Sequence, residues 1–437
     1  MPESRPQTIA KITWRLMPFL GLLYLIAYID RQNVSYAKLQ MVGDLGLSEA
    51  AYGLGASLFF IGYFIFEVPS NVILARVGAR RWLARIIFSW GLVTIALAFT
   101  QNATMFYILR FLLGAAEAGF FPGVLFALTL WFPQMYRGRM VGLFMAWSAL
   151  ANAVGSTLGG ALLDLDGMLG LKGWEWVFIA TGIPAVLMGV VTYFFLPDRP
   201  ETANFLDAGE KKWLHDVLER ENADGKEQHG SPFAALLDRR VQLLALFYVA
   251  FPLGAYGLSY WLPTVVKGFG VSNTANGLLN VIPWACVAAA LWWVPRSADR
   301  TGDHTWHIVI PALIAAVCLA LSVVVPGNAL KFALLCVAAA GIFAPQPVFW
   351  SLPPSFLSGA TAAAGIAAIN SVGNLGGFIA QNAVPWIGDV TGSQLAPMWF
   401  LAACMVAGAL MTFVVQAALR RHRPPAPPTS GRMSPAE

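Results

Sequence analysis

The sequence predicts an all-α membrane protein in which twelve transmembrane helices form two similar six-helix bundles. Of its 437 residues, 57% are hydrophobic and only 12% are charged, and the mean hydropathy is +0.63. Soluble globular domains are less apolar and carry about twice that share of charged residues. Apolar stretches of about 20 residues, enough to cross about 30 Å of hydrocarbon, recur along the chain. Two segments also recur at a constant offset, which predicts the division into two bundles.

The predicted helices follow the apolar stretches in order, and short polar segments separate them. Their expected spans are residues 13–35, 51–75, 82–100, 104–131, 139–163, 175–196, 240–266, 274–295, 305–325, 329–350, 362–387 and 394–419. The opening of the chain lacks the pattern of a cleaved signal peptide, so we expect the first stretch to be retained as a helix.

The basic residues predict the orientation of these helices. Twenty-two of the 28 Lys and Arg residues fall in the amino terminus, after even-numbered helices and in the tail. The opposite loops hold Lys38, Lys172, Lys267 and Lys331. The positive-inside rule therefore predicts that both termini are cytoplasmic, as an even number of helices requires. Because the basic residues are spread over short loops, the net charge of +5 does not indicate nucleic-acid binding.

The internal repeat has an offset of 224 residues. LGLSEAAYG (45–53) matches FGVSNTANG (269–277), and ARVGAR (75–80) matches DRTGDH (299–304). One offset at two equivalent places indicates duplication of a six-helix unit. Two homologous halves are the architecture of an alternating-access transporter, which exposes a central site to either side by rocking.

The repeat and the longest polar segment divide the chain into four parts. We expect an amino-terminal six-helix bundle over 1–196, a charged cytoplasmic linker over 197–239 and a carboxyl-terminal bundle over 240–420. Residues 421–437 are rich in proline and polar residues and cannot bury enough apolar surface to fold, which predicts a disordered tail.

Few ionisable residues lie well inside the predicted helices, and all are in the first half of the chain. They are Asp30, Arg31, Glu67, Arg110 and Glu117. An Asp, Lys or Arg at the membrane centre costs about 2.5 to 3.5 kcal/mol on insertion scales, so each should face protein or a water-filled cavity. Arg110 and Glu117 are seven residues apart, which places them on one helical face about 10 Å apart.

These charges predict an anion site with a proton carrier beside it. An arginine aimed into a cavity can bind a carboxylate through two hydrogen bonds, so Arg110 is a candidate ligand, and a static ion pair with Glu117 is the alternative. Asp30 and Arg31 point about 100° apart on a helix. This favours separate roles, Asp30 carrying a proton and Arg31 contacting the anion, over a salt bridge at a helix end. Glu67 lies near the cytoplasmic break, which favours a structural or gating role.

The second half of the chain offers polar and aromatic candidates instead of charges. Asn370 and Asn374 are four residues apart and share one helical face, as two contacts to one ligand should. The other candidates are Tyr256, Tyr260, Trp261, Gln346 and Trp350. For each single aromatic residue, packing in the core or at the membrane interface is the alternative.

Several stretches resemble the anion:cation symporter family of the major facilitator superfamily. They are YIDRQNVSYA (28–37), EVPSNVILARVGARRWLARI (67–86), RFLLGAAEAGFFPG (110–123), WFPQMYRGR (131–139) and GWEWVFIATGIPAVLMGVVTYFFLPDRP (173–200). The resemblance covers nearly the whole chain. It implies the major facilitator fold and proton-driven uptake of a small organic anion through the bacterial inner membrane. It also implies a monomer in the lipid bilayer that needs no cofactor.

The resemblance also assigns roles to individual residues. Asp30 and Glu117 are similar to proton-coupling acids, and Arg31 and Arg110 to anion-handling bases. The implied substrate pocket adds Tyr63, Trp350 and Asn370, and Ser148 stands near the position where sugar-acid carriers are expected to offer a longer polar group.

A loop motif of the superfamily, roughly G-x-L-x-D-R-x-G-R-R, points to gating residues. After the second helix this motif has Ala75 at its acidic position, followed by Arg76, whereas Asp299 and Arg300 retain it after the eighth helix. We therefore expect gating contacts from Arg76, Asp299 and Arg300, with Glu67 or Asp299 as a substitute for the missing acid.

The expected substrate is a small organic carboxylate, tartrate-like or aromatic. Ser148 makes a polyhydroxylated substrate less expected, and LDLDGMLGLKGWEW (163–176) resembles the tartrate and hydroxyphenylacetate branch. A sugar-acid (aldonate or hexuronate) symporter stays an alternative, as does a proton-coupled drug or cation exporter, which would not need two buried arginines. No G-x-S-x-G, H-E-x-x-H or phosphate-loop pattern occurs, which disfavours an enzyme.

Overall fold

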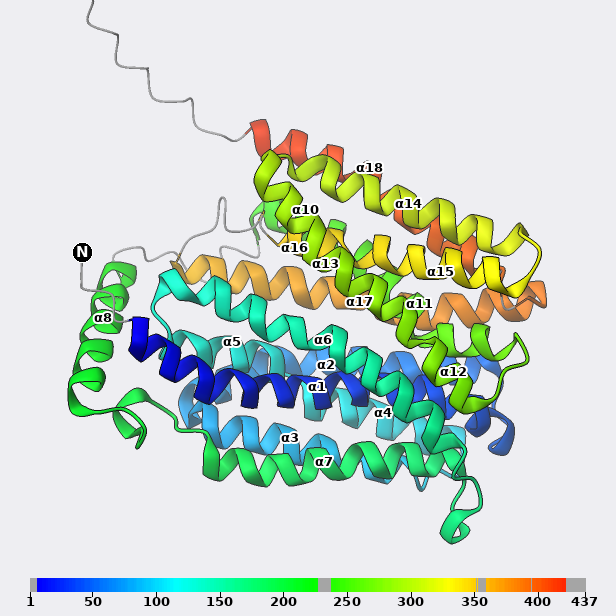
Figure 1. Ribbon diagram of the computed structural model, residues 1–437, viewed down its shortest axis with the longest axis horizontal. Coiled ribbons are helices and arrows are strands. Elements are labelled where there is room, and N and C mark those ends of the chain that lie inside the picture. The colour runs from blue at the N-terminus through cyan, green and yellow to red at the C-terminus, as the bar shows by residue number, and fades with distance from the viewer. Residues whose placement is uncertain (1–5, 227–236, 351, 353–358, 394, 422–437) are drawn as a thin grey trace, which may run out of the picture.

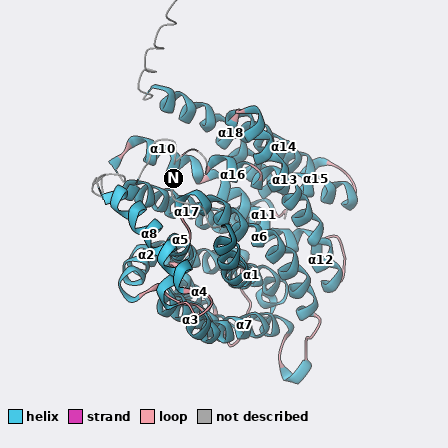
Figure 2. Cartoon of the chain, turned by 60° about the vertical axis from the view of Figure 1, so that its left-hand side comes forward, coloured by secondary structure: helices cyan, strands magenta, loops and turns pink. Residues whose placement is uncertain are grey.

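The computed structural model describes residues 6–226, 237–350, 352, 359–393 and 395–421, and no strand occurs among them (Figure 2). The predicted tail, from residue 422 onward, lies outside these residues. The first half contains α1 (Pro6–Asp44), α2 (Glu49–Val77), α3 (Ala79–Leu97), α4 (Ala103–Glu117), α5 (Phe120–Trp131), α6 (Gln134–Leu163), η1 (Met168–Gly170) and α7 (Gly173–Phe195). The connection contains η2 (Pro200–Thr202) and α8 (Ala208–Lys226). The second half contains α10 (Arg239–Tyr248), α11 (Ala250–Lys267), α12 (Asn273–Leu279), α13 (Val281–Thr301), α14 (His304–Val324), α15 (Asn328–Phe343), α16 (Pro345–Phe349), α17 (Gly359–Thr391) and α18 (Pro397–Arg421).

The helices account for the twelve predicted spans. Ten apolar helical stretches among the described residues are long enough to cross a membrane. Four of these stretches are pairs of consecutive helices, namely α4 with α5, α10 with α11, α12 with α13 and α15 with α16. The remaining two spans are α3 and α17, which are 19 and 33 residues long. The all-α membrane fold that hydropathy predicted is confirmed.

The two halves use the same helix pairings. In the first half α3 packs on α7, α1 on α6 and α2 on α4. The corresponding pairs of the second half, α14 with α18, α11 with α17 and α13 with α15, also pack together. The halves meet through α2 against α17, α6 against α12 and α13, and α1 against α11 (Figure 1). This arrangement is the pseudo-symmetry that the sequence repeat predicted.

The repeated sequence has a structural cause in each half. Ser48 accepts a hydrogen bond from the Ala51 amide at 3.0 Å, and Ser272 accepts one from the Ala275 amide at 3.1 Å, so both serines cap the start of a helix. Gly53 and Gly277 lie five residues later, where a Cβ would collide with the backbone of the opposite half. The repeat therefore retains the serine that caps the start of each helix and the glycine that allows the two halves to pack closely.

The bundle has two ends, called the linker end and the distal end below. The linker end carries α8, the start of α1 and the end of α18 (Figure 1). The distal end carries the connection from α6 to α7 and the helix α12. At the distal end the halves are joined by Asp164, which accepts hydrogen bonds from the Asn273 side chain at 2.9 Å and from the amide and hydroxyl of Thr274.

Candidate functional site

Asp30 and Arg31, near the middle of α1, point to different neighbours. Asp30 is 1% exposed, and its Oδ1 accepts hydrogen bonds from the Thr94 hydroxyl at 2.7 Å and the Asn33 amide at 3.1 Å. These partners lie on α3 and on α1 itself, so Asp30 faces the interior of the first half. Its Oδ2 is buried without a hydrogen-bond partner among the described residues. The two adjacent side chains therefore point in different directions, as predicted from their positions on a helix.

Arg31 faces the boundary between the halves. Its Nε donates a hydrogen bond to Glu117 Oε1 at 2.6 Å, and its guanidinium donates to the Tyr256 hydroxyl of α11 at 3.5 Å. The guanidinium carbon also lies 5.4 Å from the centroid of the Tyr63 ring, within the range of cation–π attraction. Arg31 thus joins α1, α2, α4 and the second half at one point.

The ion pair that Glu117 forms differs from the one that the sequence suggested. Spacing on one helix grouped Glu117 with Arg110, but Glu117 pairs with Arg31 of another helix. Arg110 and Glu117 both lie within α4 and are about 10 Å apart along its axis, whereas Arg31 approaches Glu117 from α1. The predicted fourth span is broken directly afterwards, where Gly119 adopts a left-handed conformation with φ +89° before α5 begins. Glu117 Oε2 has no hydrogen-bond partner among the described residues.

Arg110 is completely buried, with an exposed fraction of 0%, and only some of its hydrogen-bond donors have partners. One terminal nitrogen donates to the Ala56 carbonyl at 3.2 Å, and the guanidinium lies 5.0 Å from the centroid of the Phe59 ring. Its Nε and its other terminal nitrogen have no hydrogen-bond partner among the described residues. Tyr260, on α11, lies near enough to interact electrostatically with it. Arg110 therefore has two donors available beside the boundary between the halves.

The sequence-predicted pocket residues are only partly brought together. Tyr63 lies against Arg31, as described. Trp350 makes its hydrogen bond to another residue, since its indole N–H donates to the Tyr248 hydroxyl at 3.1 Å. Asn370 contacts Glu67 instead of the arginines. Ser148 and Asn374 are half-buried, and neither side chain makes a hydrogen bond to the charged cluster (Asp30, Arg31, Arg110 and Glu117) within the described part of the chain.

Among the candidate gating residues, Glu67 bridges the halves. It is 2% exposed, and its carboxylate accepts a hydrogen bond from the Ser371 hydroxyl of α17 and a longer one from the Asn370 amide at 3.5 Å. Arg76 and Arg300 are exposed and form no ion pair with any residue that the structure describes. The side chain of Asp299 lies outside the described residues. The gating roles of these four residues stay predictions.

Sequence reasoning missed Lys38. The first apolar stretch was expected to end at residue 35, which placed Lys38 in a loop, but α1 continues to Asp44. Lys38 is 4% exposed and forms an ion pair with Glu49 at 2.7 Å. Hydropathy missed this extension of α1 because the polar residues after residue 35 resemble a loop. The spacing of seven residues between Arg31 and Lys38 was an available signal that both lie on one face of the same helix.

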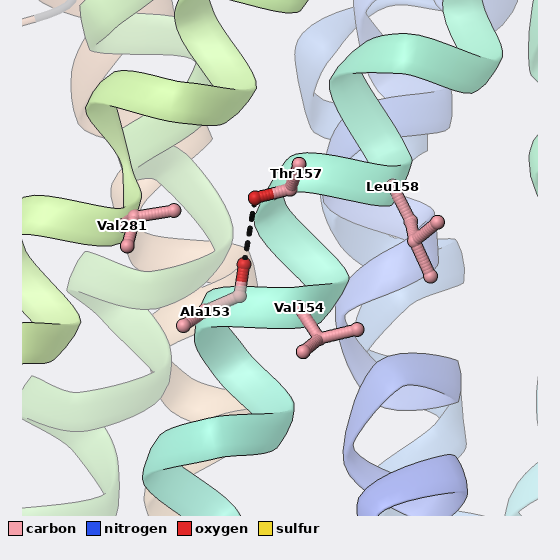
Figure 3. A pocket seen from close by; sticks show the side chains of 5 residues that line it. All are labelled: Ala153, Val154, Thr157, Leu158 and Val281. Carbon is pink, nitrogen blue, oxygen red and sulfur yellow. Dashed lines mark hydrogen bonds between the residues drawn. The ribbon is translucent and has the colours of Figure 1, made fainter.

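A pocket elsewhere in the molecule does not suit an anion. Between α6 and α13, an open hollow is lined by Ala153, Val154, Thr157, Leu158 and Val281 (Figure 3). Its one hydroxyl, on Thr157, already donates to the Ala153 carbonyl at 3.1 Å. With no charge in its lining, this hollow cannot compete with the charged cluster for a carboxylate. Among the described residues, no group of three His, Cys, Asp or Glu side chains could hold a metal ion.

Comparison with known proteins gives matches to membrane transporters. A family model described as Major Facilitator Superfamily matches residues 20–381. A protein of Agrobacterium vitis, named for inferred tartrate transport, is 45% identical over 94% of this chain and 92% of its own length. A quinolone resistance transporter of Acinetobacter baumannii is also 45% identical, over 96% of this chain and 98% of its own.

Solved structures show the same fold. A bacterial homologue of the human lysosomal transporter Spinster superposes with a TM-score of 0.74, over 97% of this chain and 100% of the other. At 16% sequence identity this similarity concerns the fold alone.

Proposed function

Since this chain belongs to the major facilitator superfamily of membrane transporters, we propose that it carries a small organic carboxylate together with a proton. The substrate class is tartrate-like or aromatic acids, and the direction is uptake by alternating access. The distribution of basic residues supports placing the linker end in the cytoplasm and the distal end outside the bacterial inner membrane. The similarity to a relative named for tartrate transport supports the same substrate class.

The observation that carries this proposal is the unsatisfied guanidinium of Arg110. A buried charge whose donors are partly unpaired is costly, and a carboxylate from solution can supply both the opposite charge and the missing hydrogen bonds. Arg31, which also reaches the boundary between the halves, is already bound to Glu117. Arg110 is therefore the primary substrate ligand, and Arg31 is shared between Glu117 and the bound anion.

Two buried carboxyl groups are available to carry the proton. Asp30 and Glu117 each have one oxygen without a hydrogen-bond partner among the described residues, so each can accept a proton without losing an existing bond. Protonation of Glu117 weakens its hold on Arg31, which then contributes its positive charge to the substrate. Binding of the anion and binding of the proton thus favour each other, which is the requirement for symport.

A thermal-shift panel tests the substrate class. Purified protein is heated with tartrate, phthalate, hydroxyphenylacetate, a hexuronate, a quinolone and a lipophilic cation, each at two pH values. A ligand that binds the folded state raises its melting temperature. We expect stabilisation by one of the first three acids, and more at the lower pH. Stabilisation by the hexuronate alone would favour a sugar-acid carrier.

A second candidate is a proton-coupled drug exporter of the same fold. The similarity to the quinolone resistance transporter favours it, since the two chains match over almost their full lengths. Stabilisation by the quinolone or the lipophilic cation, with no response to the small acids, would support export and contradict the proposed uptake.

A further inference from the structure

Lys38 is a buried cation that the proposed mechanism does not use. Its ammonium nitrogen lies 3.5 Å from the centroid of the Trp261 ring and 5.3 Å from that of Tyr52. It also pairs with Glu49 at 2.7 Å and lies 3.4 Å from the Thr264 hydroxyl. Removing an ammonium from water costs several kcal/mol in a real protein. These partners offset that cost in the present conformation.

Lys38 and Arg31 form a line along α1. They are seven residues apart, which is about 10 Å along a helix and nearly the same face. Both reach α11 of the opposite half, Arg31 at Tyr256 and Lys38 at Thr264. Lys38 lies on the distal side of Arg31, because α1 runs toward the distal end. An anion that moves along this seam from the distal end would meet Lys38 first.

The partners of Lys38 divide between the two halves. Trp261 and Thr264 belong to α11, whereas Glu49, at the start of α2, belongs to the same half as Lys38. When α1 and α11 separate, Lys38 loses the Trp261 ring that covers it and keeps Glu49 and the more distant Tyr52 ring, which both belong to α2. The side chain of Glu49 is 27% exposed and can turn to solvent. The ammonium then becomes available to a carboxylate.

On the basis of the proposed function, we propose that Lys38 is an entry site that binds the carboxylate of the substrate on the distal side before it reaches Arg31. Trp261 covers this site when the distal end is closed. Glu49 holds the ammonium in place when the site is empty, and it competes with the substrate for it.

The entry site and a purely structural ion pair predict different signs for two variants. Lys38→Gln removes the ligand, so KM for uptake from the distal side rises. Glu49→Gln removes the competing carboxylate, so KM falls. If the pair merely closed the distal end, both variants would break the same contact and would shift KM in the same direction.

The experiment measures initial uptake of radiolabelled tartrate, phthalate and hydroxyphenylacetate into right-side-out vesicles. Loss of one charge-assisted hydrogen bond corresponds to about a tenfold rise in KM for Lys38→Gln, with the maximal rate little changed. Glu49→Gln should lower KM. Lys172→Gln is the matched control, because Lys172 forms another ion pair at the distal end, with Asp44 at 3.1 Å, and its KM should equal that of the wild type.

Each outcome separates the two proposals. Saturable wild-type uptake with opposite shifts in the two variants supports the entry site. Saturable wild-type uptake with an unchanged KM in Lys38→Gln, or with both variants shifted in the same direction, overturns the entry site and leaves the proposed function standing. Absence of wild-type uptake for all three acids overturns the proposed function, and the entry site with it.

Discussion

Replacement of Arg110 tests the assignment of the anion ligand. In Arg110→Lys the positive charge remains, but the planar array of several donors is lost. The two unpartnered nitrogens of Arg110, Nε and Nη1, lie on different edges of the guanidinium, and each can donate one hydrogen bond to a substrate oxygen. At about 1.5 kcal/mol for each bond to a charged group, the pair contributes about 3 kcal/mol, or about a hundredfold in Kd. Lysine restores one such bond, so we expect a loss of about tenfold in the variant.

The assay is isothermal titration of the purified variant with the acid that stabilises the wild type best. Arg139→Lys is the control, because Arg139 is exposed and belongs to no predicted site. The melting temperature and gel-filtration profile of both variants show whether the bundle is intact. A folded Arg110→Lys protein whose Kd stays within about twofold of the wild type would refute the claim that the unsatisfied donors of Arg110 bind the substrate.

Three further predictions concern other parts of the molecule. Asp30→Asn should abolish accumulation driven by a pH gradient in proteoliposomes while sparing substrate exchange, and normal accumulation would exclude Asp30 as a proton carrier. Ser371→Ala leaves the buried carboxylate of Glu67 without its hydroxyl donor, so it should cost about 1 to 3 kcal/mol of stability and lower the melting temperature, unlike the exposed Thr301→Ala. Hydrogen bonds, chiefly from the Thr274 hydroxyl, lower the pKa of Asp164 below its ordinary value of 3.8. Because a depressed folded pKa stabilises fully above the unfolded pKa and loses this effect as the pH falls through the folded pKa, Thr274→Val should melt below the wild type at neutral pH. This difference should vanish as the pH falls through the folded pKa of Asp164, and a constant difference would contradict the argument.

The sequence was sufficient for the fold because the relevant signals are local. Apolar length predicts spanning helices, and the structure shows that the repeated segments contain the serine that caps α2 and its counterpart at α12. The ends of helices were less predictable. Polar residues after residue 35 resembled a loop, yet α1 continues for another two turns because the Trp261 ring of α11 and the carboxylate of Glu49 accommodate Lys38.

The sequence predicted which residues belong to the candidate site better than it predicted how those residues pair. The cost of burying charge singled out Asp30, Arg31, Arg110 and Glu117, and the structure places all four in buried or half-buried positions near one another. Which arginine holds Glu117 depends on how α1 is placed relative to α4, since Arg110 and Glu117 lie about 10 Å apart on one helix. Such contacts between helices leave no pattern in a single sequence.

The central claim is that a carboxylate and a proton move together, and proton movement in proteoliposomes tests it most directly. Vesicles that contain the purified protein and a pH-sensitive dye are given an inward gradient of the acid that binds best, with no pH gradient. The proposed symport predicts that the interior becomes more acidic at a rate that saturates with substrate, and that Asp30→Asn abolishes the change. Substrate entry without any acidification would contradict it.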